Sequence, residues 1–307
     1  MSDTLPIYPP TRTDTYDRCP LLDELSNKER WVPRQATKLL VGGLAGRAFA
    51  LGTAGIHRGE PTDACVKTAI ESFHSDLTHN ATHGVLFEAS IDEIVAASGV
   101  AETLPKYAAA NPFKGWDIQD VERRLPDHGR CIIDIGGKDT DGVLSVADVK
   151  YKQNLDARYR SSTIEEYQIS WQFLHYPWAY GEVKGEPCYR MYLCLVTYKP
   201  KFSVELIPHE VHPETQQMWL ASAKAKWARM ADPDAQLEMS TRHKDGFGMC
   251  HYYKACFTYH LDEGLMSQDY VIVPDRRPVV DTTHQEPLRA SECTSLPGTN
   301  LILDGIE

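Results

Sequence analysis

The sequence lacks the long apolar run, about 18 residues, that a membrane-spanning helix requires. Its N-terminus, MSDTLPIYPPTRTD, also lacks the basic and then apolar pattern of a secretory signal. No internal repeat or low-complexity tract is visible. These absences predict a globular protein without membrane association, located in the cytoplasm, or in the host cytoplasm if the protein is viral.

Positively charged residues are fewer than negatively charged ones. The chain has 32 Lys and Arg against 43 Asp and Glu, a net charge of −11. This balance argues against a protein that coats nucleic acid non-specifically, because such binding depends on Lys and Arg displacing counterions. It does not exclude a nuclease, because bound cations reverse the local field that a phosphate meets.

Two further features are absent or thinly represented. The glycines at Gly42, Gly136 and Gly137 do not fit the pattern G-x-x-x-x-G-K-[ST], so any helicase motor must be a partner. The 8 cysteines are scattered over 307 residues, which predicts reduced thiols rather than a disulfide framework.

Enough apolar sequence is present for a sizeable core, at 42% of all residues. The patterns predict helices over 33–57, 62–77 (capped by Thr62), 84–111, 163–180 (capped by Thr163) and 213–230. They predict strands over 116–125, 131–136, 143–150, 189–198 and 202–210. This order indicates one mixed α/β domain.

The domain organisation follows from the same patterns. Residues 1–33, rich in Pro, Thr and Asp, are expected to form an extended arm with little core of its own. Residues 34–274 form the main domain, with a helical insert at 34–111 and a catalytic core at 112–232. The polar, proline-containing tail 275–307 is expected to be disordered.

The most informative stretch is IIDIGGKDTDGVLSVADVKYK, which starts at Ile132. A turn, DTDG, separates Asp134 from Asp148, so the stretch predicts a hairpin that sets the two acids side by side. Lys150 points the same way as Asp148, because strand side chains alternate between faces. Two carboxylates and an ammonium group would then suit a divalent cation and the hydrolysis of a phosphoester.

The alternative is a surface hairpin with solvated side chains. It is disfavoured because the residues around the acids are apolar and largely β-branched, as in a buried sheet: Ile132, Ile133, Ile135, Leu144, Val146, Ala147 and Val149. Glu122, on the preceding strand, is either a further acid contact or a solvated strand-end residue.

On the helix expected after the hairpin, Gln172 and Tyr176 lie one turn apart and share a face, to which Gln168 also belongs. Asp134, Asp148-x-Lys150 and Gln172-x-x-x-Tyr176 together resemble the signature of the RecB-like branch of the PD-(D/E)xK nucleases, which includes lambda-type exonucleases. The family's first motif resembles Gly52-x-x-x-x-His57, and its N-terminal opening resembles Tyr16-x-x-Cys19-Pro20. The resemblance spans residues 16 to 256.

The resemblance implies a restriction-endonuclease-like fold, a mixed sheet flanked by helices. It implies Mg²⁺ or Mn²⁺ as the cofactor, with ligands from His57, Asp134, Asp148 and the backbone carbonyl of Val149. Two departures stand out: Cys131 lies where the family has Gly, and the middle acid is Asp148 rather than the more frequent Glu.

The resemblance also assigns catalytic roles. Lys150 would position or activate the attacking water and stabilise the pentacovalent phosphate. Gln172 would hold this lysine or the substrate phosphate, and Tyr176 would brace the helix or touch the DNA backbone.

Several family members carry an iron–sulfur cluster on four cysteines. The chain matches three of the four positions, with Cys19, Cys250 and Cys256. The fourth position is Phe247, and a substitute ligand would have to come from His243 or His251. We therefore expect no iron–sulfur cluster, and these cysteines to be packing residues.

The function implied is a divalent-metal-dependent exonuclease that acts on DNA ends in recombination or repair, of the phage type. Its partners would be DNA and a single-strand annealing protein or a helicase. Three alternatives remain open: an endonuclease with the same site, a catalytically silent nucleic-acid-binding module, and a hydrolase of small phosphoesters.

Overall fold

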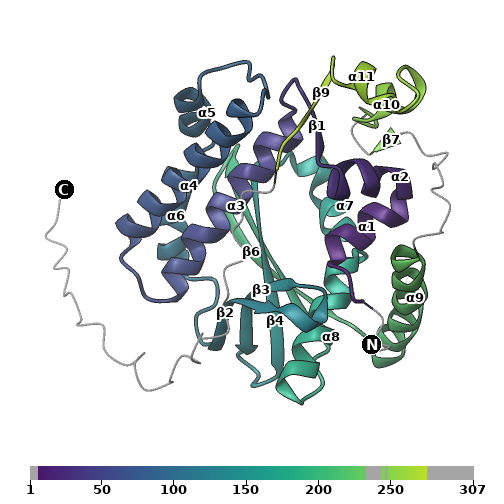
Figure 1. Ribbon diagram of the computed structural model, residues 1–307. Coiled ribbons are helices and arrows are strands. Elements are labelled where there is room, and N and C mark those ends of the chain that lie inside the picture. The colour runs from purple at the N-terminus through teal and green to yellow at the C-terminus, as the bar shows by residue number, and fades with distance from the viewer. Residues whose placement is uncertain (1–5, 233–243, 246–247, 275–307) are drawn as a thin grey trace, which may run out of the picture.

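The computed structural model describes residues 6–232, 244–245 and 248–274. Its centre is a five-stranded sheet in the order β2-β3-β4-β5-β6, in which only β4 and β5 are parallel (Figure 1). The strands are β2 (Asp117–Leu125), β3 (Cys131–Lys138), β4 (Leu144–Asn154), β5 (Arg190–Lys199) and β6 (Ser203–Glu210). A short 3₁₀ turn, Pro126–His128, joins β2 to β3. The five predicted strands are confirmed, as is the mixed α/β class.

Four helices pack on one face of the sheet: α3 (Lys38–His57), α4 (Thr62–Thr82), α5 (Ile91–Ala97) and α6 (Val100–Ala110). Phe49 and Leu104 from these helices are buried against alternate residues of β4, among them Ala147 and Val149. The helices predicted over 33–57 and 62–77 are confirmed, but Thr62 begins α4 rather than capping it, because Pro61 occupies the N-cap. The range 84–111 contains two helices, α5 and α6, rather than one.

Contrary to the sequence analysis, one helix, α3, is long and apolar enough to cross a membrane by length and composition alone. In this fold it contributes to the interior, where Leu44, Ala48 and Phe49 are buried in the same core as strand β4. Its apolar composition is therefore accounted for by packing.

The opposite face carries α7 (Ala157–Gln168) and α8 (Trp171–Lys184). The prediction of a single helix over 163–180 is wrong. Asp156 caps α7 by accepting the backbone N–H of Arg158, and Ser170 adopts extended backbone as the N-cap of α8. Since the chain turns at Ile169 and Ser170, Gln168 does not lie on the helix that carries Gln172.

The composition predicted an extended arm over residues 1–33, and this prediction is wrong for the described residues 6–33. They form α1 (Pro10–Arg18), α2 (Pro20–Asp23), a π turn (Glu24–Lys28) and β1 (Trp31–Pro33). Leu21, Leu25 and Trp31 are buried in a separate core together with Tyr252 and other residues of the C-terminal segment. That partner lies 221 positions from Trp31, so periodicity along the chain could not show it.

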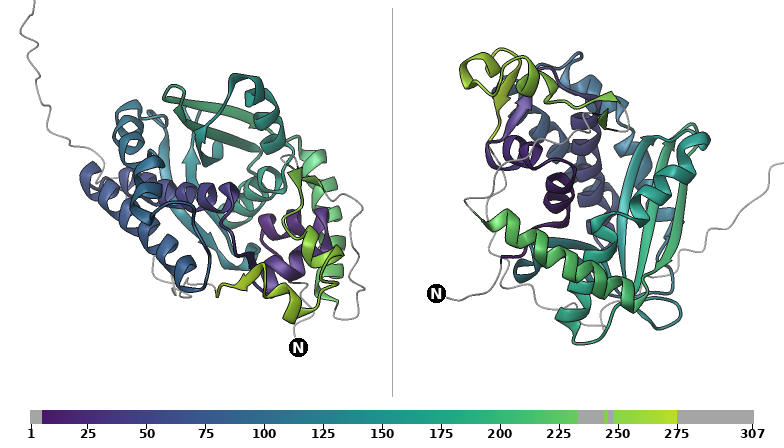
Figure 2. Two further views of the ribbon diagram at one scale, coloured as in Figure 1. Left: turned by 90° about the horizontal axis from the view of Figure 1, so that it is seen from above. Right: turned by 90° about the vertical axis from the view of Figure 1, so that its right-hand side faces the viewer.

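Helix α9 (Pro213–Ala231) packs in a different cluster, against Tyr16 of α1 and Trp171 and Trp178 of α8. The elements that follow it are β7 (Lys244–Asp245), β8 (Gly248–Met249), α10 (Tyr253–Phe257), α11 (Glu263–Met266) and β9 (Tyr270–Ile272), of which α10, α11 and β9 contribute to the core around Trp31. β1 pairs antiparallel with β9, and Figure 2 shows the N-terminal helices, in purple, beside the C-terminal segment, in yellow-green. The proposed tail 275–307 lies outside the described residues, and the division into insert and catalytic core stays a prediction.

Candidate active site

The predicted hairpin is confirmed, and its turn is stiff. The carboxylate of Asp139 accepts the backbone N–H groups of Asp141 and Val143. It also accepts bonds from Arg190 and Tyr192 on β5. Burial alone would raise the pKa of Asp139, but these donors hold it at about 2. These bonds fix the turn and therefore the relative position of β3 and β4 where they begin to pair.

The two strands separate at the predicted acids. β3 and β4 pair only from Lys138↔Leu144 to Ile135↔Ala147, although both continue further. Immediately beyond, Asp134 Oδ2 accepts the backbone N–H of Val149 at 2.8 Å. A side chain thus replaces the next ladder bond, and the strands diverge where Asp134 and Asp148 lie.

Glu122 adds a third acid at the same level of the sheet. On β2 it falls between the pairs Val121↔Ile135 and Arg123↔Ile133, which sets it opposite Asp134. Its backbone φ is 53°, a left-handed conformation that is uncommon for a residue with a side chain and especially so within a strand. Three neighbouring strands therefore each present one carboxylate at the divergence.

These neighbouring acids shift the pKa values of one another. Burial raises the pKa of Asp134 well above its usual range, and repulsion from Asp148 and Glu122 adds to this. The pKa of Glu122 is also raised, first by burial and then by Asp148, although Arg58 and Arg124 oppose the shift. Buried carboxylates that repel one another favour either a proton or a cation.

Lys150 supplies a positive charge beside Asp148, as predicted. Its ammonium lies 2.9 Å from Oδ1 and 2.8 Å from Oδ2 of Asp148. Burial would lower the pKa of Lys150, but Asp148 and Asp134 outweigh it and the pKa is raised, so the ammonium stays charged at neutral pH. Apart from this ion pair with Lys150, the buried Oδ2 of Asp148 has no hydrogen-bond partner among the described residues.

Helix α8 approaches the acids from one face. Gln172 and Tyr176 share a side of the helix, as predicted, and the Gln172 amide donates to the Tyr176 hydroxyl at 2.6 Å. Burial raises the pKa of Tyr176 well above its usual range, and the nearby Asp148 and Asp134 raise it further. The hydroxyl therefore keeps its proton next to the carboxylates.

His57, at the end of α3, approaches from the other face, but through a second residue. Its Nε2 lies 2.8 Å from the hydroxyl of Tyr107. Burial lowers the pKa of His57 to about 4, so the ring is neutral at pH 7. Burial raises the pKa of Tyr107, and the nearby Cys194 and Asp134 raise it further. Sequence analysis missed Tyr107 and Cys194, which belong to no motif and meet only through folding.

The donor set is suitable for a hard divalent cation. It offers carboxylate oxygens on adjacent strands, among them the buried Asp148 oxygens that the Lys150 ammonium contacts, and a neutral imidazole nearby. Within the part of the chain that the structure describes, however, no three His, Cys, Asp or Glu side chains are already arranged around one point. Asp134 instead accepts the Val149 N–H and His57 bonds Tyr107, so cation binding would require these side chains to rotate.

Three cysteine thiols lie together where the N-terminal helices pack against the C-terminal segment. Cys19, Cys250 and Cys256 pack in the N- and C-terminal core, and burial, followed by the other two thiols, raises the pKa of Cys256 to about 11. His251 is exposed. Phe247 and His243 lie outside the described residues, so the fourth position of the family pattern is not visible. The absence of a cluster stays a prediction.

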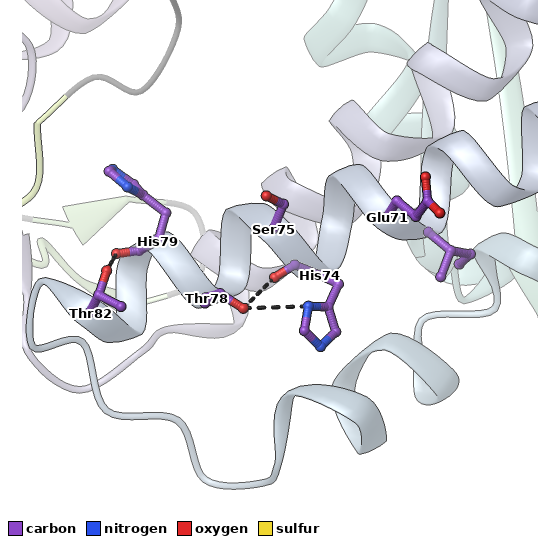
Figure 3. A pocket seen from close by; sticks show the side chains of 7 residues that line it. Glu71, His74, Ser75, Thr78, His79 and Thr82 are labelled. Carbon is purple, nitrogen blue, oxygen red and sulfur yellow. Dashed lines mark hydrogen bonds between the residues drawn. The ribbon is translucent and has the colours of Figure 1, made fainter.

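A hollow of about 700 Å³ lies along α4 (Figure 3). The residues that line it come from this one helix: Ile70, Glu71, His74, Ser75, Thr78, His79 and Thr82. It contains none of the predicted site residues. Its polar side chains already have partners: Thr78 donates to the His74 carbonyl at 2.8 Å, His74 lies 3.4 Å from Asp92 of α5, and His79 lies 3.0 Å from the Pro274 carbonyl.

Comparisons with known proteins add little to this geometry. No family model matches the sequence, and no curated protein matches it. One similar solved structure is a protein of Eubacterium rectale named "Putative exonuclease", with a TM-score of 0.44 and 12% identity, covering 90% of this chain and 92% of that one. The role of the site is therefore inferred from its own residues.

Proposed function

We propose that the protein is a divalent-metal-dependent deoxyribonuclease, most simply an exonuclease acting on DNA ends. One observation carries the proposal: Glu122, Asp134 and Asp148 occupy one level of three adjacent strands, with the Lys150 ammonium bonded to Asp148. Such a cluster is costly in an interior unless charge compensates it, and clustered acids of this kind mark functional sites.

The proposed roles follow the geometry. Asp134, Asp148 and the carbonyl of Val149 would hold Mg²⁺ or Mn²⁺, joined by His57 after it leaves Tyr107. When bound, the cation would polarise the phosphate and acidify a water molecule. Lys150 is placed to orient that water or to donate to a phosphate oxygen, because its ammonium has donors beyond the one used by Asp148.

Residues of α8 have supporting roles in this proposal. Tyr176 keeps its proton and can donate toward the carboxylates or a phosphate, and Gln172 fixes the tyrosine hydroxyl. A location in the cytoplasm, a part in recombination or repair, a phage-type origin and a helicase or annealing partner belong to the same proposal.

The test is incubation with linear and covalently closed circular DNA, with Mg²⁺ or Mn²⁺ and then with chelator. We expect degradation from ends only, abolished by chelator and by Asp148→Asn. The matched control is Asp127→Asn, which changes an exposed acid in the turn between β2 and β3.

Other outcomes select the alternatives. Cutting of closed circles would indicate an endonuclease. DNA binding without cleavage under any metal would indicate a silent binding module. Hydrolysis of bis(p-nitrophenyl) phosphate without action on DNA would indicate a hydrolase of small phosphoesters.

A further inference from the structure

One aromatic ring lies beside both lysines at the edge of the acid cluster. The ammonium of Lys150 is 5.8 Å from the centre of the Tyr167 ring, and that of Lys152 is 5.4 Å from it. Both distances fall within the range over which a ring face attracts a cation, about 6 Å. Lys150 and Lys152 share this ring because residues two apart on β4 point the same way.

The Tyr167 ring is held in place by packing against a residue of the next helix, α8. Tyr167 stacks on Phe173 of α8, with ring centres 6.4 Å apart and planes at 29°, and Phe173 is fully buried. The two rings come from separate helices, because α7 ends at Gln168 and α8 begins at Trp171. No residue of α7 is buried, and the helix meets the core through the partly buried Ile164 and Tyr167.

Lys150 is therefore confined from two sides. Asp148 binds its ammonium at 2.8–2.9 Å, and Tyr167 lies beyond it. A lysine head on a four-carbon stem has several rotamers, and a carboxylate alone does not select among them. A ring that faces the ammonium restricts it to the one arrangement in which it stays at the edge of the acids.

We propose that Tyr167 is a positioning residue, whose ring fixes the Lys150 ammonium for catalysis and aligns Lys152 beside it. The kinetic part of this inference rests on the proposed nuclease function, whereas the geometric part does not. The ring, rather than the hydroxyl, performs this role, so Tyr167→Phe should preserve it and Tyr167→Leu should remove it.

The geometric test needs no activity. In protein labelled with ¹³C at lysine Cε, the ring current of Tyr167 should shift the Lys150 and Lys152 signals upfield, with assignment by Lys150→Ala and Lys152→Ala. Both signals should stay shifted in Tyr167→Phe and return toward ordinary values in Tyr167→Leu. Unshifted signals in the wild type, or unchanged signals in Tyr167→Leu, would overturn the inference.

The kinetic test asks whether Tyr167 acts through Lys150. Tyr167→Leu should lower kcat about fivefold, the size of one partly exposed cation–π contact, with KM little changed. In the Lys150→Ala background the same substitution should have no further effect on kcat. An equal loss in both backgrounds would indicate general disruption and reject the positioning role.

Two controls separate this role from packing. Tyr159→Leu removes an exposed tyrosine of the same helix and should leave kcat and the lysine signals unchanged. Tyr167→Met keeps apolar bulk on Phe173 and replaces Tyr167→Leu if that variant does not fold. If the wild type degrades no DNA, the nuclease proposal fails, and the lysine signals alone decide the role of Tyr167.

Discussion

At the scale of single residues, the acid cluster favours function at the expense of stability. Asp134 is an acid whose pKa is raised on folding, so it costs stability increasingly as the pH rises from its ordinary value toward the raised one. At neutral pH the cost is present in the cation-free protein. Removing the charge should therefore stabilise the fold while it destroys the site.

We predict that Asp134→Asn unfolds at a higher temperature than the wild type in chelator, because the amide oxygen can still accept the Val149 N–H without repelling Asp148. Added Mg²⁺ or Mn²⁺ should raise the melting temperature of the wild type and not that of the variant. Scanning calorimetry with and without metal measures both effects. Unchanged metal titration in Asp134→Asn and Asp148→Asn would show that the site is misplaced.

A second prediction concerns Lys150→Ala. Metal and DNA affinity should stay near wild type, and turnover should fall on the order of 100-fold, as when one preorganised contact to a transition state is lost. Single-turnover cleavage of end-labelled DNA measures the rate separately from binding. Near-normal turnover in this variant would remove Lys150 from the mechanism.

The sequence could predict Asp134, Asp148 and Lys150 because a hairpin with alternating side chains fixes their relation locally. It could not predict Tyr107 or Cys194. These residues come from α6 and β5, and only the packing of α6 against α3 and the sheet brings the tyrosine hydroxyl to His57. The motif implied that His57 is a metal ligand, whereas its Nε2 here is bonded to Tyr107.

At the scale of elements, α8 contains a buried histidine within an aromatic cluster. His175 is fully buried, its Nε2 lies 2.9 Å from the carbonyl of His128, and its Nδ1 has no partner within the described chain. The rings of Trp178, Trp219 and Trp227 surround it at 5.4–5.8 Å. Burial lowers the pKa of His175 to about 4, so the ring is neutral in the folded protein.

This predicts an acid-sensitive fold. Above pH 6.5, His175 is neutral whether the chain is folded or unfolded, and no stability is lost. As the pH falls from 6.5 toward 4, the unfolded chain takes up the proton first, and about 3 kcal/mol of stability is lost through this one group. Urea unfolding at several pH values measures the slope.

The matched variant is His175→Gln, in which the amide can still donate to the His128 carbonyl but does not titrate. It should be less stable at pH 7, because it loses ring packing, and should show a flatter pH dependence between 6.5 and 4. Parallel curves for wild type and variant would assign the acid sensitivity to other groups.

The elements also show where sequence patterns are sufficient. The strands were predictable because apolar β-branched residues and turn signals are local. The break between α7 and α8 could not be predicted, because the spacing of apolar residues continues through it. The structure instead has two helices, with Asp156 as the N-cap of α7 and Ser170 as the N-cap of α8. That break determines which residues face the lysines of β4.

At the scale of the whole molecule, the cluster of Cys19, Cys250 and Cys256 leads to a prediction about the colour of the purified protein. We expect protein purified without oxygen to be colourless and to contain no stoichiometric iron or labile sulfide, because Phe247 stands where the family pattern requires a thiolate. Cys256→Ser should then cost stability without any metal signal, since it places a hydroxyl in an apolar core. A brown preparation that loses its colour in Cys256→Ser would contradict this.

The pairing of β1 with β9 has a consequence for synthesis. Leu21, Leu25 and Trp31 are made early, yet the residues that cover them, including Tyr252, emerge more than 200 positions later. A nascent chain that ends near residue 232 already contains all three acids and Lys150, but its N-terminal apolar side chains remain exposed. Interrupted translation should therefore yield an aggregating fragment, recognised by chaperones, rather than a premature nuclease.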